Sequence, residues 1–545
     1  MKHFILKTLI FFIVGLYGAV SYAQMAHNLL IGNAKAITLG NAVTADPPGI
    51  DSIHFNPAGL TRLKGHQYEL KFIMGDVTIG GAFELNNQDI IAKYEEKGFE
   101  DPVANTKTTV DAFAVYLPFV GHTDIPILAA PLGGVSWNRE GSKFTFANAV
   151  YAPMIFGMSR KDDDPGRFYG RELSITRLTF FSPSVGYQWT DTLSVGLSVG
   201  FSYVGVGVDL PYRAPSQLLE ELTELTNDLC GRSENPRYFL EISDSILDLD
   251  VCRGQLSPFE TLFDLEVELE KVVSITYNLG ILWEATDWLT LGFAYLSGVA
   301  DVLKGPLSIQ IEKENLLQLV QGLTESTIFG STLILETFIR DTIHTPVDGL
   351  IETTGQVTLN TPQHVTAGIS VKVLPRLKVN IDVKWTETSV WKDLTFRFDE
   401  KIGLFDLFSI VGVDGAYADR LEVPRGYVDT VNWGIGFEYQ YNQKLDLRLG
   451  FEPRKTGIPD NRRDYLIPLS DIDVIAVGFS YKLTNHSSFD FAFSHIKSEM
   501  FIPTGTSTNG NDIRFNNFVF NPTAGLDTYS SIEITIIETS YRTTF

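Results

Sequence analysis

Ser198 stands in the stretch of sequence that most resembles a catalytic motif. Residues 196–200 read GLSVG and match the G-x-S-x-G pattern of serine hydrolases. That chemistry requires the serine on a sharp turn between a strand and a helix, with a histidine and an acid nearby. Here Ser198 falls inside an alternating stretch from Leu193 to Phe201, which predicts a strand. We therefore expect no catalysis at Ser198 and no enzyme.

Histidine and cysteine spacing does not indicate metal or cofactor chemistry. The nine histidines show no H-x-x-x-H or comparable ligand spacing, so we predict neither a metal site nor a cofactor. Cys230 and Cys252 are the two cysteines, too few for a disulfide scaffold or a zinc site made of cysteines alone. In an exported chain they are a reasonable disulfide pair; the alternative is two free thiols.

The N-terminus carries an export signal. Lys2 and Lys7 precede an apolar run over 9–20, and small residues at 21 and 23 predict cleavage after Ala23. An N-terminal anchor is the alternative, but the run is short of the roughly 20 residues that span a bilayer. The formal net charge of −23 argues against nucleic acid, whose binding depends on Lys and Arg meeting phosphates.

Period-two alternation dominates the rest of the chain. In the stretch 377–385, apolar residues alternate with Lys378, Asn380, Asp382 and Lys384, and 431–441, 445–452 and 475–483 behave alike. These are strands with one apolar and one polar or small face. A soluble sandwich is the alternative, but the strands approach ten residues and aromatics gather near their ends, as in membrane barrels.

Counting such stretches predicts an all-β fold, a fourteen-stranded antiparallel transmembrane β-barrel over 66–545. The connection 119–141 is longer than the short turn expected at its place. Short turns are expected at 190–191, 286–287, 442–443 and 484–485. The candidate strands are 66–75, 108–118, 142–152, 172–190, 192–209, 271–284, 288–299, 355–373, 375–390, 428–441, 444–454, 472–483, 486–497 and 530–545.

Two insertions, near 214–270 and 312–345, carry leucines at helical spacing, so we expect helical extracellular loops. A loop in water would not expose so much apolar surface. The helices either pack on one another as a cap or form the entrance for an apolar ligand. The candidate ligand-binding residues here are Leu316, Leu319, Val320 and Leu323.

Residues 24–65 precede the first strand and do not alternate. A fourteen-stranded barrel has a lumen that its own side chains do not fill, so we expect this segment to be a hatch inside it. A disordered tail is the alternative, but apolar residues such as Leu30, Ile53 and Phe55 argue against it.

Lys378, Lys384 and Arg448 should face the lumen, because their neighbours along the strands are apolar and face lipid. One interpretation pairs them with Asp382, Glu438 or other acids of the lumen. The other makes Lys384 or Arg448 the partner of a ligand carboxylate.

The hatch sequence resembles a known family. Residues 41–65, and above all Asn56-Pro57-Ala58-Gly59-Leu60, are similar to the hatch of the FadL/TodX family of outer-membrane fatty-acid and hydrocarbon transporters. The stretch 445–483 also resembles it. The resemblance implies a plugged fourteen-stranded barrel with an extracellular groove and an internal pocket. It also implies release sideways, where the third strand kinks inward.

We therefore expect passive transport of hydrophobic molecules across the outer membrane, of fatty acids or hydrocarbons, by a groove, a pocket and a hatch that rearranges. Expected partners are that ligand, outer-membrane lipid and the barrel assembly machinery, with no nucleic acid, and the chain is expected to be a monomer. The alternatives are a lipid-modifying enzyme of the outer membrane and a general porin or adhesin.

Overall fold

In the computed structural model, the residues that are described are 31–125, 128–230, 238–242, 245–249, 257–313, 315–318, 327–329, 348–403, 405, 415–513 and 521–545. Within them the chain forms one large antiparallel sheet, which closes on itself because β1 (Gly65–Glu84) pairs with β26 (Asp527–Thr544) from Gln67 to Glu84. No helix among these residues has the length and apolar character to cross a membrane.

Fourteen barrel strands make up this sheet in the described part of the chain, as predicted, and some of them are interrupted and carry two labels. In chain order they are β1 (Gly65–Glu84), β5 (Leu128–Asn138), β6 (Phe144–Ser159), β7 (Glu172–Phe181) with β8 (Ser184–Gln188), β9 (Leu193–Tyr212), β12 (Phe263–Thr286), β13 (Leu289–Leu296) with β14 (Val299–Ile311), β16 (Leu350–Thr361) with β17 (His364–Leu374), β18 (Leu377–Thr386) with β19 (Asp393–Phe398), β21 (Arg420–Pro424) with β22 (Thr430–Gln440), β23 (Leu445–Arg454), β24 (Ile472–Lys482), β25 (Ser487–Ile502) and β26 (Asp527–Thr544).

Smaller elements lie inside the barrel and around it. Two short strands extend the wall, β2 beside β1 and β20 beside β21, whereas β3 and β4 form a separate hairpin. The bounds are α2 (Ala34–Thr38), η1 (Gly49–Asp51), α3 (Ser52–Phe55), η2 (Pro57–Arg62), α4 (Gln88–Lys97), β2 (Thr106–Thr109), β3 (Phe113–Leu117), β4 (Gly121–Ile125), η3 (Pro165–Tyr169), α5 (Gln217–Cys230), β10 (Tyr238–Ile242), β11 (Ser245–Leu249), β15 (Thr327–Phe329), η4 (Thr388–Val390), β20 (Ala416–Tyr417) and η5 (Asp460–Arg462).

Strand β12 shows how alternation makes a wall with two faces. Ile275, Leu279 and Ile281 are about half exposed, whereas Ser274 and Asn278 are buried. Successive side chains on a strand point to opposite faces, so the apolar set meets lipid and the polar set lines the lumen. On this strand the prediction that apolar side chains face lipid and polar ones face the lumen is confirmed.

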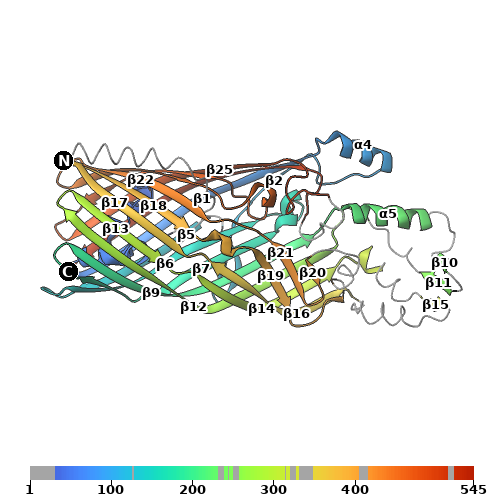
Figure 1. The fold of residues 1–545 in the computed structure, drawn as a ribbon, viewed down its shortest axis with the longest axis horizontal. Helices are drawn as coiled ribbons and strands as arrows, with labels where there is room; N and C mark the ends of the chain where they lie inside the picture. The colour runs from blue at the N-terminus through green and yellow to red at the C-terminus, as the bar shows by residue number, and fades with distance from the viewer. Residues whose placement is uncertain are drawn as a thin grey trace.

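The two ends of the barrel differ. Figure 1 shows the C-terminus at one end, and α4, α5, β10, β11 and β15 gathered at the other. The predicted short turns at 190–191, 286–287, 442–443 and 484–485 each join consecutive barrel strands. Barrels of this kind keep short turns on the periplasmic side and long loops outside, so the helical end is extracellular.

The second barrel strand is not where the sequence predicts it. The expected strand 108–118 is wrong: its residues form part of β2 and β3, and the barrel strand is β5, inside the expected connection 119–141. The reason lies in β5 itself, which reads LAAPLGGVSWN. Its Ala, Pro and Gly residues blur the contrast between the two faces, so no alternation marks it.

The extracellular insertions contain strands as well as the predicted helix α5. One strand from the second insertion, β15, pairs with β11 of the first, so the two insertions share a three-stranded sheet. The expectation of a helix is wrong for the end of the first insertion: Leu265 and Leu269 lie on β12, which begins at Phe263, and Leu269 is buried. Helical spacing and strand alternation coincide for residues four apart.

Candidate functional site

The hatch fills the lumen near the periplasmic end. Its short elements α2, η1, α3 and η2 contact the inner faces of β8, β9, β12 and β23 to β25. Asn56 organises the predicted motif: its Oδ1 accepts a hydrogen bond from Ala58 N (3.1 Å), while Nδ2 donates to Thr44 O (2.7 Å) and to Ile281 O of the wall (3.0 Å). The residues of this motif, Asn56, Pro57, Ala58, Gly59 and Leu60, are all buried.

Gly59 is needed for close packing. A Cβ at this position would lie 2.5 Å from Pro47 Cβ, and the backbone of Gly59 does not have a positive φ. The hatch therefore folds back on itself at Gly59, and any larger residue would force Pro47 away.

The wall presents glycines where the hatch backbone touches it. A Cβ at Gly280 would be 2.1 Å from Asn56 Oδ1, and one at Gly434 would be 2.1 Å from the carbonyl oxygen of Gly40. Real Cβ atoms do not approach other atoms so closely, so the hatch lies directly against the backbone of the strands. The other wall glycines with a hatch atom within 3 Å of such a Cβ are Gly134, Gly186, Gly196, Gly292, Gly368, Gly436, Gly450 and Gly478.

Buried ion pairs also hold the hatch. Lys71 of β1 lies 2.8 Å from both oxygens of Asp51, and the two side chains are almost fully buried. Lys378 of β18 bridges Asp46 of the hatch and Glu438 of β22, at 2.6 Å each. Because a buried charge without its partner is strongly unfavourable, these pairs stabilise the seated position of the hatch.

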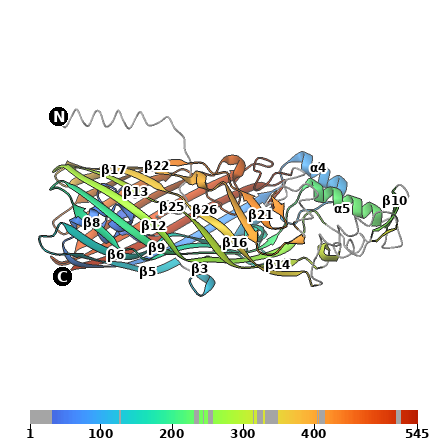
Figure 2. The same cartoon turned by 60° about the horizontal axis from the view of Figure 1, so that its bottom comes forward.

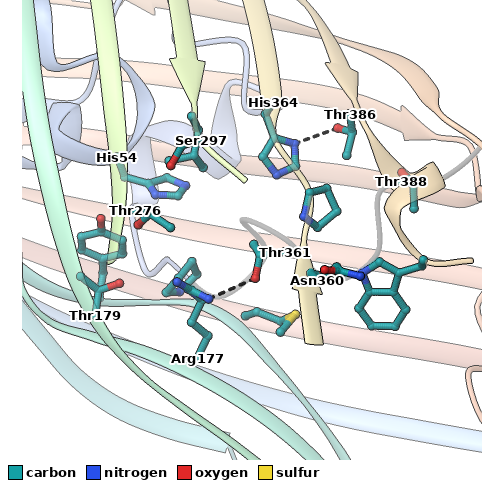
Figure 3. A pocket seen from close by; sticks show the side chains of 16 residues that line it. His54, Arg177, Thr179, Thr276, Ser297, Asn360, Thr361, His364, Thr386 and Thr388 are labelled. Atoms are coloured by element: carbon teal, nitrogen blue, oxygen red, sulfur yellow. Dashed lines mark hydrogen bonds between the residues drawn. The ribbon is translucent and has the colours of Figure 1, made fainter. Parts of the chain in front are cut away.

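A cavity, here called the lumen cavity, opens beside the hatch (Figure 3). It encloses about 780 Å³ of empty space, the part open to solvent included, which lies within the range of ligand pockets, about 300–1,000 Å³. Most of its wall is apolar, with Tyr151 and Met154 of β6 and Trp391 among the lining residues, and His54 faces it from the hatch.

The cation that lines the lumen cavity is already neutralised. Arg177 of β7 donates to Asp301 Oδ2 (3.0 Å), Ser274 Oγ (2.7 Å) and Thr361 Oγ1 (3.1 Å), and Lys271 shares the same aspartate (2.8 Å). The sequence did not single out this cluster, because its members come from four strands.

Lys384 lies in a smaller polar cavity that shares His54, Leu296 and His364 with the lumen cavity. Within the described part of the chain, its ammonium forms no ion pair and no hydrogen bond. The acids on its side of the lumen are engaged elsewhere: Asp382 accepts from Thr44 N (2.8 Å) and Glu452 binds Arg454 (2.8 Å). Lys384 is thus a half-buried cation at a cavity, without an ion-pair partner among the described residues.

The other predicted ligand-binding residues have surroundings unlike those of Lys384. Arg448 pairs with Glu438 and Asp490, at 2.7 Å each, so the structure assigns it to the ion-pair network of the wall. Leu316 is buried in the extracellular apolar core beside Leu218, Leu219 and Leu262. Leu319, Val320 and Leu323 lie outside the described residues. So does Cys252, so its pairing with Cys230, the last residue of α5, stays a prediction.

Ser198 has no catalytic setting. It lies within β9, facing Ser184 of β8 on one side and Asn278 of β12 on the other. A hydrolase nucleophile stands on a strand-to-helix turn, and Ser198 does not.

The wall is interrupted at β6, the third barrel strand. The pairing of β6 with β7 shifts register between Tyr151 and Met154, around Pro153. On its other side β6 pairs with β5 only as far as Val150, and β1 leaves β5 at Gly75. A second cavity, here called the aliphatic cavity, lies at this break, and its lining includes Val77, Ile79, Ile155, Ile496, Ile532 and Ile536.

Comparison with known proteins agrees with this architecture. Residues 17–545 match the model of a family described as outer membrane protein transport protein (OMPP1/FadL/TodX). The solved structure of a Pseudomonas aeruginosa FadL homologue is 17% identical, with a TM-score of 0.63 over 96% of this chain and 100% of that one. The Ralstonia pickettii toluene transporter TbuX is 16% identical, with a TM-score of 0.53 over 95% and 99%.

A curated relative matches over a shorter stretch of this chain. The putative outer membrane protein NMB0088 of Neisseria meningitidis serogroup B is 23% identical over 240 residues, 44% of this chain and 45% of that protein. The matched region thus spans less than half of that relative. The family match, by contrast, extends over nearly the whole chain and agrees with the plugged barrel, so this chain belongs to the OMPP1/FadL/TodX family of outer-membrane transport proteins.

Proposed function

We propose that this channel carries hydrophobic molecules with a carboxylate head, of the fatty-acid type, across the outer membrane. The observation that supports an acid over a plain hydrocarbon is Lys384, a half-buried cation without an ion-pair partner in the described structure, next to an apolar cavity. A charge drawn out of water is unfavourable unless it is paired, so a ligand carboxylate would supply the partner that the described residues do not. The tail would fill the lumen cavity beside Tyr151 and Trp391.

The route would begin outside and end in the membrane. The ligand would first reach the extracellular end, where the loops pack an apolar core that contains Leu219 and Leu316. The aliphatic cavity and the lumen cavity both border the break in β6, since Ile155 lines the first and Met154 the second. We infer that the ligand leaves sideways at this break when the hatch shifts, because the hatch blocks the straight path to the periplasm.

A general porin is the competing function, and the hatch argues against it. Wall glycines such as Gly280 and Gly434 are in contact with the hatch backbone, so the periplasmic half of the lumen holds protein where a porin has an open channel. Steady, large conductance of the purified wild-type protein in planar bilayers would overturn the proposal.

The ligand class is tested by equilibrium binding of a long-chain fatty acid and of the alkane of equal length to the purified protein in detergent. Replacing Lys384 by Met removes a charge-assisted hydrogen bond worth about 1.5–3 kcal/mol, so the affinity for the acid should fall about 10–150-fold. Affinity for the alkane should not change. Lys482→Met, at an exposed position of β24, is the matched control.

Two results would contradict the fatty-acid proposal. Equal affinity of wild type and Lys384→Met for the acid would show that Lys384 does not meet the carboxylate. Alkane binding as tight as acid binding in the wild type would make a hydrocarbon the cargo.

A further inference from the structure

The β3–β4 hairpin lies on the outside of the barrel. Figure 2 shows β3 and its loop projecting from the lower wall. A bridge between Ala112 and Ser159 starts the hairpin at β6, and Tyr116 N donates to Thr176 Oγ1 of β7 (3.1 Å). The Tyr116 ring covers Gly205 of β9, where a Cβ would be 2.3 Å from it. Thr176 precedes Arg177, which faces the lumen, so Thr176 and the hairpin are on the outer face.

This part of the outer wall is polar and stands above the membrane. On β12 the outward residues Glu266, Glu268 and Glu270 precede Val272 and Val273, where the exposed apolar band begins. Charged residues on the lipid face are unfavourable, so the acids mark the extracellular side. The hairpin packs at the level of these acids, since a Cβ at Gly121 would contact the Glu268 carboxylate at 3.4 Å.

Three potential metal ligands meet between the hairpin and β7. His122 Nε2 lies 3.1 Å from Glu172 Oε2 and 3.8 Å from Asp124 Oδ1, and one atom of each residue lies within 4.8 Å of the others. Two serines contact the other polar atoms of His122 and Asp124. His122 Nδ1 and Ser174 Oγ are 2.9 Å apart, and Ser159 Oγ donates to Asp124 Oδ2 (2.8 Å).

The arrangement leaves Nε2 without a hydrogen bond. Only 11% of the His122 side chain is exposed, and Nε2 is buried and makes no aligned hydrogen bond despite its nearness to Glu172. When Nδ1 donates to Ser174 Oγ, the lone pair of the neutral ring is on Nε2 and points at two carboxylates. Metal-binding histidines are fixed in this way by a partner on the other ring nitrogen.

Within the described residues, neither carboxylate forms an ion pair with a lysine or an arginine. Arg171, which precedes Glu172 in the chain, is engaged by Asp209 (2.8 Å) and Asp264 (3.0 Å).

We propose that His122, Asp124 and Glu172 bind a divalent transition-metal ion of the zinc type, through Nε2 and one oxygen of each carboxylate. Imidazole with carboxylates is a ligand set that zinc accepts, with a fourth position left for water, whereas calcium takes oxygen ligands. The ion would tie the hairpin to β7. It would thereby brace the outer wall beside the break in β6, at a site that the spacing of the histidines in the sequence does not indicate.

The test is Zn²⁺ binding by tag-free protein in detergent, stripped with a chelator and measured by calorimetry and by metal analysis after dialysis. We expect one ion per chain, lost in His122→Ala and in Glu172→Gln. Ser174→Ala keeps all three ligands but frees the ring, so its affinity should fall about 10–100-fold. His486→Ala, at an exposed turn far from the hairpin in sequence, should bind like wild type.

No binding by wild type, or one ion retained in both His122→Ala and Glu172→Gln, would overturn the proposal. Heat-modifiability gels establish that each variant is folded. If His122→Ala does not fold, Glu172→Gln and Ser174→Ala decide, because both leave the hairpin side of the cluster intact.

Discussion

The contact between the hatch and the wall glycines makes a direct prediction for Gly434→Ala. The added Cβ would sit 2.1 Å from the carbonyl oxygen of Gly40, about an ångström closer than any real contact. Neither partner is a flexible side-chain end, so the hatch backbone must move. Overpacking of this kind costs about 1–3 kcal/mol. Since each 1.4 kcal/mol is tenfold, the fraction of molecules with a displaced hatch should rise about 5–150-fold.

Bilayer conductance measures that fraction. Wild type should be nearly closed to small ions, and Gly434→Ala should show more frequent open events. The matched control is Gly80→Ala, where the nearest atom, Thr108 O, is 3.8 Å from the new Cβ and the hatch is not involved. Heat-modifiability gels show whether each barrel is assembled.

A deletion of residues 24–60 separates a hatch effect from a defect of the barrel. Without the hatch nothing remains for the new methyl group to meet, so Gly434→Ala should add no conductance in that background. Equal conductance of wild type and Gly434→Ala would refute the reasoning. So would an increase from Gly434→Ala that persists in the deletion, because the substitution would then act on the wall itself.

Further predictions concern the lipid face, the extracellular region and the cysteines. Val379→Arg puts a charge on the outward face of β18, at about 2–4 kcal/mol near mid-bilayer, and should lower the yield of folded barrel. Asn380→Arg, on the inward face, should be better tolerated, and equal yields of the two variants would contradict the assigned faces. Burial raises the pKa of Glu260 to about 7, so its ionised form opposes folding and stability should fall as pH rises through that value. Protease sensitivity of the extracellular region should therefore increase between about pH 5 and about pH 8, and Glu260→Gln should abolish the increase; an unchanged pH dependence would refute the assignment. Thiol labelling of the unreduced, denatured chain should find no free thiol if Cys230 and Cys252 are paired, and two labelled thiols would disprove the pairing.

The closed barrel was predictable because alternation is a local property. Lys378 to Trp385 and Val431 to Tyr441 carry the two faces of the wall in their own order of residues, and no distant partner is needed to read it. Where a strand lacks that contrast, as β5 does with Pro131 and its glycines, the same reasoning missed it. Its place in the wall depends on β1, which pairs with it from Gly65 to Gly75.

The roles of the inward residues depended on distant strands. Lys384 and Arg448 look alike in the sequence, as cations among apolar neighbours. Only the closed barrel brings Glu438 and Asp490 to Arg448 and leaves Lys384 beside a cavity without an ion-pair partner among the described residues. The alternating sequence determined by itself that these side chains point inward. The tertiary structure alone decided what they meet there, because partners hundreds of residues away become neighbours only when the sheet closes.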